Sequence, residues 1–301
     1  MKVIFFTNSD WAIPTLTWLK NENKLEAVVS AKVSDGLNPN IEIFCTTGQI
    51  EIMHWGNIEE VVAGLKNHDY QMGLMLGFKD KISKKVLEQF THGIINIHFG
   101  ELPLYAGPDP LFWILKEGRK QVRVTAHKIN EKFDEGLEVL GREVPVFPGE
   151  PYGVLGGRLS HLIPSLLPEI FSKIEVKGLK RISSNPKPKS KPNSEDIMIR
   201  WKDHTSEEVE NLVNACNPAY GGAITFYKGA QLRILEVSPA DLENQGIFSA
   251  GGIVYSDSTY GIFVLCSDFK CLRVNLLKLE GAYISSQKFA ALGVKAHERF
   301  E

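Results

Sequence analysis

A stretch rich in proline and lysine, Lys180 to Glu195, separates two parts of the chain that follow different sequence patterns. Before it, short apolar runs alternate with segments of helical periodicity, whereas short alternating runs predominate after it. The stretch itself is too polar and too rich in proline to form a core, so we interpret it as an extended linker. The pattern therefore predicts two domains, residues 1–179 and 196–301, joined by a linker over residues 180–195.

The first part alternates predicted strands with predicted helices, an order typical of an α/β fold with a mainly parallel sheet covered on both faces. The strands are expected over Lys2–Thr7, Leu25–Ser30, Gln71–Leu76, Ile94–His98, Arg123–Ile129 and Glu138–Val146, and Glu42–His54 holds one or two more short apolar runs. The helices are expected over Trp11–Lys20 (capped by Asp10), Ile58–Lys66, a segment after Ser83, Pro110–Lys116 (capped by Asp109) and Tyr152–Ser172, where Pro164 and Pro168 should kink or split the helix.

The second part predicts one helix followed by about five short strands, an arrangement that suggests a small β-barrel of the OB kind, a fold that often binds polymers. The helix is expected over Ser206–Ala215, and the Lys228-Gly229 pair fits a hairpin turn. The strands are expected over Ala223–Tyr227, Leu232–Val237, Gly252–Tyr255, Gly261–Cys266 and Cys271–Leu277.

Composition narrows the class of protein. The 34 basic residues nearly balance the 36 acidic ones, so any surface for nucleic acid must be local. The four cysteines show no CxxC spacing, which argues against a zinc site and suits a reducing compartment such as the cytoplasm. We expect no membrane span, because no window reaches ~18 uninterrupted apolar residues, and the first residues are too short an apolar run for a signal peptide.

Two polar side chains stand at the end of the strand expected over Ile94–His98. Asn96 and His98 are two residues apart and therefore share one face of the strand. Gly100 and Pro103 follow and cannot continue a strand, so the pair lies at its carboxyl end, where ligands bind in open α/β sheets. Taken alone, a buried histidine such as His98 is more often a structural residue that hydrogen-bonds within the core than a catalyst.

The next predicted strand repeats the arrangement with Thr125 and His127 on one face. This second pair could belong to the same site or simply form hydrogen bonds across the sheet. Asp134, in the turn that follows, is the best candidate for a carboxylate that orients His98, because connections at one edge of the sheet converge on the same crevice. An ordinary turn aspartate is the alternative for Asp134.

An amide, an imidazole and a carboxylate together suit acyl transfer without a covalent enzyme intermediate. The amide can donate to a developing oxyanion, the imidazole can take a proton from an attacking amine, and the carboxylate can raise the basicity of the imidazole. The sequence has no nucleophile elbow, no HExxH and no P-loop. The first turn, Thr7 to Asp10, also lacks the GxGxxG of dinucleotide-binding enzymes, so we expect neither a metal nor a nicotinamide cofactor.

These motifs resemble the signature of the N10-formyltetrahydrofolate-dependent formyltransferases, and most closely of the methionyl-tRNA formyltransferases within that family. The resemblance covers practically the whole chain. It is carried by Phe6-Thr7-x-x-Asp10-Trp11-Ala12-Ile13-Pro14, by Asn96-Ile97-His98 with Leu102-Pro103, Tyr105, Gly107 and Pro110, by Val124-Thr125-x-His127 and Asp134-x-Gly136, and by Asn217-Pro218-x-Tyr220-Gly221 with Lys228-Gly229.

The resemblance implies a Rossmann-like formyltransferase domain, an OB-like carboxyl-terminal domain, and N10-formyltetrahydrofolate as co-substrate. It implies that His98 assists deprotonation of the acceptor amine, that Asn96 stabilises the oxyanion, and that Asp134 orients His98 and relays the proton. Asn96 and Asp134 would contact the folate together with a pocket loop made of Met75, Leu76, Gly77, Phe78 and Ile82. The acceptor side would be formed by Leu102, Pro103, Tyr105, Gly107 and Thr125.

The acceptor is the open question at this stage. Methionyl initiator tRNA is implied by the whole-chain resemblance, with the basic linker and the barrel as its contacts, although the linker could also be a solubilising connector. Relatives that modify tRNA carry basic residues where this chain has a short loop over Ala31 to Pro39 and has Leu104 and Ala106. An amino-sugar nucleotide or another small amine is therefore the alternative acceptor. The changes at Gly100 and Glu101 also leave open a formyltetrahydrofolate hydrolase or a folate-binding module without activity, and the sequence does not specify the oligomeric state.

Overall fold

The computed structural model describes residues 1–301 apart from residues 32–36, 131–135, 177, 184 and 243–247. The chain packs into two compact units. The first comprises residues 1–108, 122–144 and 156–189, and the second comprises residues 109–121, 145–155 and 190–301. These are packing units, and the domain limits 1–179 and 196–301 with a linker over 180–195 stay a prediction.

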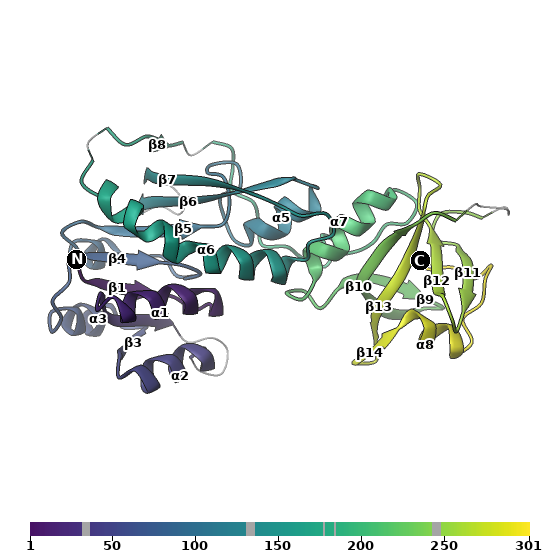
Figure 1. The fold of residues 1–301 in the computed structure, drawn as a ribbon, viewed down its shortest axis with the longest axis horizontal. Helices are drawn as coiled ribbons and strands as arrows, with labels where there is room; N and C mark the ends of the chain where they lie inside the picture. Colours follow the sequence, from purple (N-terminus) through teal and green to yellow (C-terminus); the bar gives the residue numbers. More distant parts are fainter. Residues whose placement is uncertain (32–36, 131–135, 177, 184, 243–247) are drawn as a thin grey trace. The chain divides into compact units, whose positions relative to one another are not determined.

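The first unit is built on an eight-stranded sheet with the order β3-β2-β1-β4-β5-β6-β7-β8 (Figure 1). Strands β3, β2, β1, β4 and β5 run parallel, which confirms the predicted Rossmann-like arrangement, but β6 runs antiparallel to β5 and β8 runs antiparallel to β7. The strands are β1 (Val3–Phe6), β2 (Leu25–Ala31), β3 (Glu51–Trp55), β4 (Met72–Met75), β5 (Ile94–His98), β6 (Gln121–Ile129), β7 (Gly136–Pro145) and β8 (Arg181–Ile182).

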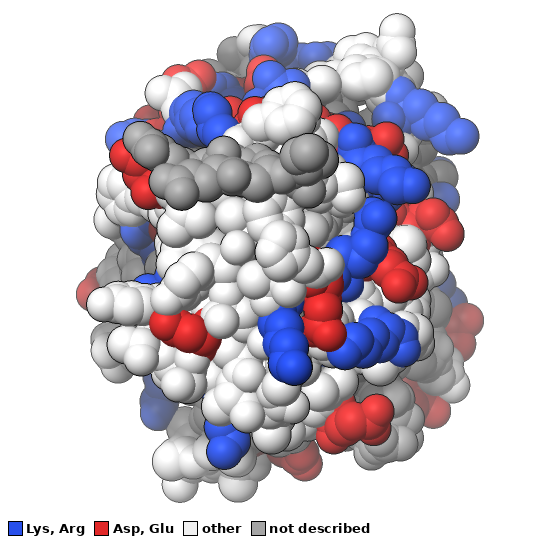
Figure 2. All heavy atoms as spheres, turned by 90° about the vertical axis from the view of Figure 1, so that its right-hand side faces the viewer, with Lys and Arg blue, Asp and Glu red and all other residues white. Residues whose placement is uncertain are grey.

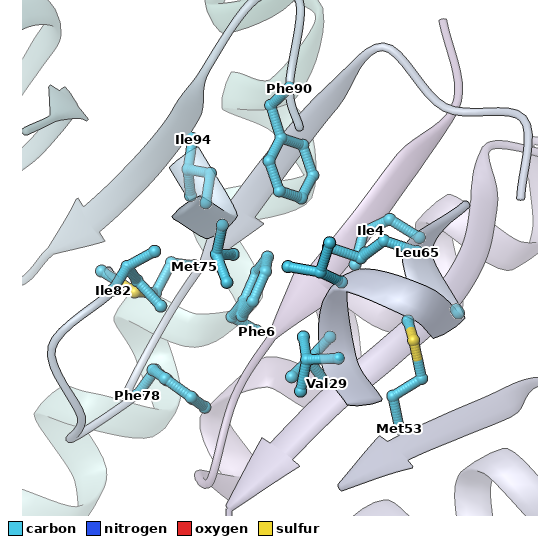
Figure 3. Packing of buried hydrophobic residues seen from close by; sticks show 14 of the residues in the cluster. Ile4, Phe6, Val29, Met53, Leu65, Met75, Phe78, Ile82, Phe90 and Ile94 are labelled. Atoms are coloured by element: carbon cyan, nitrogen blue, oxygen red, sulfur yellow. The ribbon is translucent and has the colours of Figure 1, made fainter. Parts of the chain in front are cut away.

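Helices cover both faces of this sheet. On one face α1 (Ile13–Asn21) packs against α6 (Tyr152–Lys173), where the rings of Trp18 and Phe171 lie 6.4 Å apart. On the other face α3 (Ile58–Leu65) and α4 (Lys84–Leu87) contribute to a buried apolar cluster with the strands (Figure 3). The cluster includes Ile4, Phe6, Val29, Met53, Leu65, Met75, Phe78, Ile82, Phe90 and Ile94. Burial of these apolar side chains stabilises the packing of the helices on the sheet.

Three local expectations are corrected. The first apolar run after Pro39 forms a helix, α2 (Pro39–Gly48), because the Asn38 side chain accepts hydrogen bonds from the next amides and Pro39 starts the helix favourably. The first turn of the chain is capped by Ser9, ahead of a short 3-10 helix η1 (Asp10–Ala12), and not by Asp10. Helix α6 is not split at Pro164 or Pro168, since its other positions bury Leu155, Leu159, Ile163, Leu167 and Ile170.

The second unit contains a sheet with the order β11-β12-β13-β10-β9, and β14 pairs with β13. The Lys228-Gly229 hairpin joins β9 to β10 as predicted, with both residues at positive φ. The last residues close the sheet: Ile253 of β11 donates its N–H to Glu298, and Phe226 of β9 exchanges main-chain hydrogen bonds with Glu301. The strands are β9 (Ala223–Tyr227), β10 (Ala230–Ala240), β11 (Ile253–Asp257), β12 (Gly261–Leu265), β13 (Cys271–Leu279) and β14 (Ala282–Ser285).

The helices of the second unit are α5 (Pro110–Lys116), α7 (Ser206–Cys216) and α8 (Ser286–Ala291). Helix α7 lies where the sequence predicts it, and a capping box between Thr205 and Glu208 starts it. Strand β14 and helix α8, which are only four and six residues long, were not predicted from the sequence.

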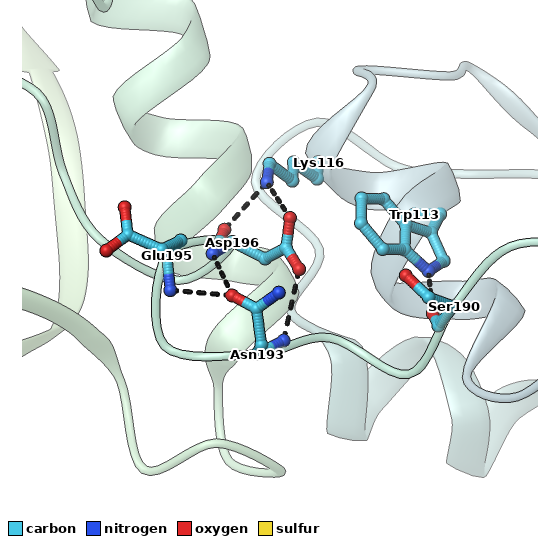
Figure 4. Close-up of polar contacts among 6 residues, drawn as sticks. All are labelled: Trp113, Lys116, Ser190, Asn193, Glu195 and Asp196. Carbon is cyan, nitrogen blue, oxygen red and sulfur yellow. Dashed lines mark hydrogen bonds and ion pairs between the residues drawn. The ribbon is translucent and has the colours of Figure 1, made fainter.

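Residues 190–196 lie against α5 in the same unit (Figure 4). The indole of Trp113 donates to the carbonyl of Ser190 (3.0 Å), and Lys116 Nζ donates to the carbonyl of Asp196 (2.7 Å). The Asn193 side chain accepts from the amides of Glu195 and Asp196 and so forms a turn. This part of the predicted linker is therefore held in one conformation by α5.

Candidate active site

Four polar side chains meet on one face of the first sheet where β5 and β6 pair. In the antiparallel register Asn96 lies opposite His127, and His98 lies opposite Thr125. Residues that face each other across an antiparallel pair point to the same side of the sheet. The two polar pairs of the sequence therefore form a single four-residue set, which we call the polar quartet.

The polar quartet continues the sheet face that carries the apolar cluster. Ile94, two residues before Asn96, belongs to that cluster, and Ile129, two residues after His127, packs against it. Asn96 and His98 retain 9% and 8% of their surface exposure, whereas Thr125 and His127 are completely buried. A ligand can thus reach the β5 side chains, while the β6 side chains support them from the interior.

Asn96 is oriented by His127. Its amide nitrogen Nδ2 lies 3.1 Å from Nε2 of His127, and both groups are buried. Since an amide nitrogen can only donate, His127 Nε2 accepts and the proton of its neutral ring lies on Nδ1. The amide group carries two N–H bonds, so this contact leaves the second one available for an oxygen atom of a substrate.

His98 is oriented by the loop that follows it. Its Nε2 lies 2.8 Å from the carbonyl oxygen of Tyr105. A carbonyl only accepts, so Nε2 carries the proton of the neutral ring, and Nδ1 is the nitrogen that can take up a proton. Thr125 holds the start of the same loop, because its hydroxyl donates to the carbonyl of Gly100 (2.8 Å).

The loop after His98 is itself folded tightly. The amide of Tyr105 donates to the carbonyl of Glu101 (2.8 Å), and Leu102, Ala106 and Ile182 form a small buried cluster. Leu104 points outward and is 38% exposed, while Ala106 is buried. Of the two positions that depart from the tRNA-modifying pattern, only Leu104 therefore offers its side chain to a ligand.

The predicted folate loop follows β4, next to Asn96 in the parallel register, where Met75 pairs with Asn96. Met75, Phe78 and Ile82 are buried in the apolar cluster, and Leu76 is buried as well. Gly77 has a positive φ of 64°, and a Cβ there would lie 2.5 Å from Cβ of Ser9, so the turn requires glycine. Any contact that this loop makes with a ligand must come largely from its main chain.

The structure places Asn96, His98 and Thr125 on one sheet face and ties the following loop to them through the carbonyls of Tyr105 and Gly100, while Leu102, Pro103 and Gly107 lie elsewhere in that loop. Asp134, the expected carboxylate partner of His98, lies outside the described residues, as do residues 32–36 of the segment Ala31 to Pro39. The roles given to all these residues stay a prediction. In the described part of the chain, no group of three or more His, Cys, Asp or Glu side chains is arranged to hold a metal ion.

A second polar cluster was not anticipated, and it lies within the second unit. The Asp109 side chain makes no capping hydrogen bond to α5, contrary to the prediction, because its carboxylate accepts hydrogen bonds from the hydroxyls of Tyr152 (3.2 Å) and Tyr220 (2.8 Å). Burial, together with the nearby Asp109 carboxylate, raises the pKa of both tyrosines, so both remain donors. Only the resemblance at Tyr220 could have pointed to this cluster, since its members are separated by 43 and 111 residues from Asp109.

The arrangement suits transfer of an acyl group to an amine. Asn96 presents an N–H donor, and His98 presents a basic nitrogen. The two residues are two positions apart on the same strand, so their Cα atoms are separated by roughly 7 Å. Both groups are held by hydrogen bonds from neighbouring elements before a ligand arrives. Groups fixed in advance cost little reorganisation when charge develops on a substrate.

Comparison with known proteins agrees with this chemistry. The family described as formyl transferase matches residues 56–171, and the formyl transferase C-terminal domain matches residues 191–291. The curated methionyl-tRNA formyltransferase of Halothermothrix orenii is 28% identical, over 96% of this chain and 96% of that protein.

Two solved structures show the same fold at low sequence identity. HypX from Aquifex aeolicus, crystallised with tetrahydrofolic acid, has a TM-score of 0.66 at 15% identity; the match covers 98% of this chain and 48% of HypX, so this chain spans about half the length of that protein. The N-formyltransferase from Helicobacter canadensis, in complex with folinic acid and dTDP-3-aminofucose, has a TM-score of 0.64 at 15% identity over 91% of this chain and 98% of that one.

The two family matches cover most of the chain, include the strand that carries Asn96 and His98, and extend into the carboxyl-terminal barrel. The chain therefore belongs to the formyl transferase family and is an enzyme that transfers a formyl group from formyltetrahydrofolate.

Proposed function

We propose that this chain transfers the formyl group of N10-formyltetrahydrofolate to the amino group of methionyl initiator tRNA. The observation that carries the proposal is the similarity to methionyl-tRNA formyltransferases along the entire chain, barrel included, at 28% identity over 96% of both proteins. A match confined to the first sheet would support formyl transfer without indicating the acceptor.

The loop after β4 supports a folate site beside Asn96. Within the described residues, none of the main-chain N–H and C=O groups from Phe78 to Ile82 takes part in a hydrogen bond. Open amide groups next to buried apolar side chains suit a flat heterocycle whose edge carries amide-like donors and acceptors, such as a pterin. The folate supplies the activated formyl group, and the remaining steps fall to residues of this chain.

In the proposed reaction His98 takes the proton of the acceptor amine on Nδ1, because Nε2 is already committed to the carbonyl of Tyr105. The second N–H of Asn96 donates to the formyl oxygen as the amine adds and negative charge develops there. Asp134 is proposed as the carboxylate that stabilises the protonated ring and passes the proton on toward the leaving nitrogen.

The acceptor could alternatively be an amino sugar. The Helicobacter canadensis structure was solved with a dTDP-linked amino sugar, and in this chain the exposed positions of the loop after His98 include the acidic Glu101 and the uncharged Leu104, neither of which is basic. The face drawn in Figure 2 has Lys and Arg side chains interspersed with Asp and Glu, and much of its area is uncharged. Because the basic and acidic residues of the whole chain nearly balance, a tRNA would have to use local basic side chains, such as the exposed Lys187 and Lys191.

A direct assay separates the acceptors. The protein is incubated with formyltetrahydrofolate and either methionyl initiator tRNA or a panel of amino-sugar nucleotides, and formylated product and free formate are measured. We expect formyl-methionyl-tRNA, with a rate at subsaturating tRNA that falls steeply between 50 and 200 mM salt, as phosphate contacts require. Formyl sugar as the sole product would overturn the proposed acceptor, and formate release without any acceptor would identify a hydrolase.

A further inference from the structure

Lys189 contacts the loop that holds His98, although its place in the proline-rich segment predicts a solvent-exposed linker residue. Its amide donates to the carbonyl of Ala106 (2.8 Å), and its Nζ lies 5.8 Å from the centroid of the Tyr105 ring. All three residues belong to the first unit. A cation at this distance over a tyrosine ring is attracted by the ring's electron-rich face.

The main chain at Lys189 lies very close to the main chain of the loop at Gly107. Gly107 adopts a φ of +101°, and a Cβ at this position would lie 2.3 Å from the carbonyl oxygen of Lys189. Only glycine lets the segment approach so closely, because the φ and the contact both exclude a side chain. The fit is thus specific to these two segments of main chain.

Tyr105 links this contact to the catalytic base. Its carbonyl oxygen accepts the hydrogen bond from His98 Nε2, and its buried ring faces Lys189 on the other side. A shift of the loop would move the carbonyl oxygen and release the ring of His98 from its fixed tautomer. The position of Lys189 therefore bears on which nitrogen of His98 is basic.

We propose that Lys189 is a positioning residue for His98: it holds the loop over residues 99–107 so that the carbonyl of Tyr105 keeps the proton of His98 on Nε2 and leaves Nδ1 as the base. The expected effect of Lys189 on turnover rests on the proposed catalytic function of His98. The expected effect of Lys189 on the tautomer of the His98 ring does not depend on that function. Leu104 and Ala106 give the loop no positive charge, and Lys189 places a cation beside it.

Ring spectroscopy tests the proposal without reference to any acceptor. The full chain is labelled with 15N, and long-range 1H–15N correlations of the histidine rings are recorded, with His98 assigned from its loss in His98→Gln. In the wild type we expect the neutral ring to carry its proton on Nε2. In Lys189→Met we expect the two nitrogen shifts of His98 to move toward each other, as in a ring that exchanges between tautomers.

Three variants sharpen the result. Lys189→Arg keeps a cation over the ring and should restore the wild-type shifts, and Lys187→Met, at an exposed lysine two residues away, should leave them unchanged. Gly107→Ala should reproduce the Lys189→Met spectrum through the main chain, which keeps the test available if one variant folds poorly. Wild-type shifts in both Lys189→Met and Gly107→Ala, or a wild-type proton on Nδ1, would overturn the proposal.

The kinetic arm uses formyltetrahydrofolate and methionyl-tRNA. Lys189→Met should lower kcat about 10- to 100-fold, as expected for a misplaced catalytic group, and should move the pH profile of kcat, while a contact to tRNA alone would raise KM. If His98→Ala keeps full turnover, the proposed role of His98 fails, and the ring spectra still decide whether Lys189 positions it.

Discussion

The decisive residue in the candidate site is Asn96, because its amide can act only if it is held in one orientation. The buried His127 provides that orientation by accepting one N–H at 3.1 Å. An asparagine without such a partner could rotate and present its oxygen instead of its nitrogen to the formyl oxygen, and the developing charge would then be repelled.

Replacing Asn96 tests this role. Asn96→Ala should lower kcat by about 10²–10³-fold, the usual cost of losing one donor to a developing oxyanion, with little change in the KM of either substrate. The measurement is steady-state formyl transfer with methionyl-tRNA. Asn67→Ala, at an exposed asparagine just beyond α3, is the matched control and should retain wild-type kcat; equal turnover of the two variants would exclude the role of Asn96.

Helix α6 contains two neighbouring glycines, Gly156 and Gly157, that differ in their surroundings. A Cβ at Gly156 would lie 2.0 Å from the ring of Trp11, so the helix depends on glycine to approach that ring. A Cβ at Gly157 would meet nothing within 4 Å. Gly156 is thus required by packing, whereas Gly157 only adds conformational entropy to the unfolded chain.

This contrast predicts opposite changes in stability. Gly156→Ala should lower the free energy of unfolding by about 1–3 kcal/mol through overpacking against Trp11. Gly157→Ala should raise it by about 0.5–1 kcal/mol, because alanine favours the helix. Urea unfolding followed by circular dichroism measures both. If the two variants shift the midpoint in the same direction, the packing of α6 on Trp11 is not as described.

At the scale of the whole molecule, the carboxyl-terminal barrel depends on contacts between residues far apart in sequence. Glu298, in the closing segment, accepts hydrogen bonds from Tyr227 (2.5 Å) and Lys228 (2.6 Å), some 70 residues earlier. Phe300 is completely buried and stacks on Trp201 with centroids 5.8 Å apart. The closing segment is therefore anchored by both polar and aromatic contacts.

The polar anchor makes stability depend on pH. Hydrogen bonds from Lys228 and Tyr227 lower the pKa of Glu298 from its usual value to about 2. A carboxyl group whose pKa is lower in the folded state stabilises the fold above its unfolded pKa of about 4.3, and this contribution is lost as the pH falls through about 2.

Glu298→Gln should accordingly unfold at lower urea than the wild type at pH 6, and the two midpoints should converge as the pH is lowered from 5 to 2. Glu195→Gln, at an exposed glutamate outside the closing segment, should show no such convergence. A midpoint difference for Glu298→Gln that stays constant with pH would show that the carboxylate charge does not stabilise the closed barrel.

Much of the fold can be predicted from the sequence, because many of its helices, strands and turns are specified by neighbouring residues. Alternation of strands and helices, the Lys228-Gly229 turn and the helix over Ser206–Ala215 depend on neighbouring residues and were predicted correctly. Burial outweighs local preference in α6, whose apolar positions offset the cost of Pro164 and Pro168. Helix α2, in contrast, begins at a local signal, the Asn38 cap followed by Pro39, that was not recognised in the sequence.

The two polar pairs of the candidate site are readable from the sequence, because period-two spacing puts Asn96 with His98, and Thr125 with His127, on single strand faces whatever the rest of the chain does. That the pairs join into one quartet becomes visible in the folded chain alone, since the antiparallel register of β5 and β6 is set by packing over the entire sheet. The contact of Lys189 with Tyr105 likewise emerges from the fold, because a contact between segments more than 80 residues apart leaves no periodic trace in sequence.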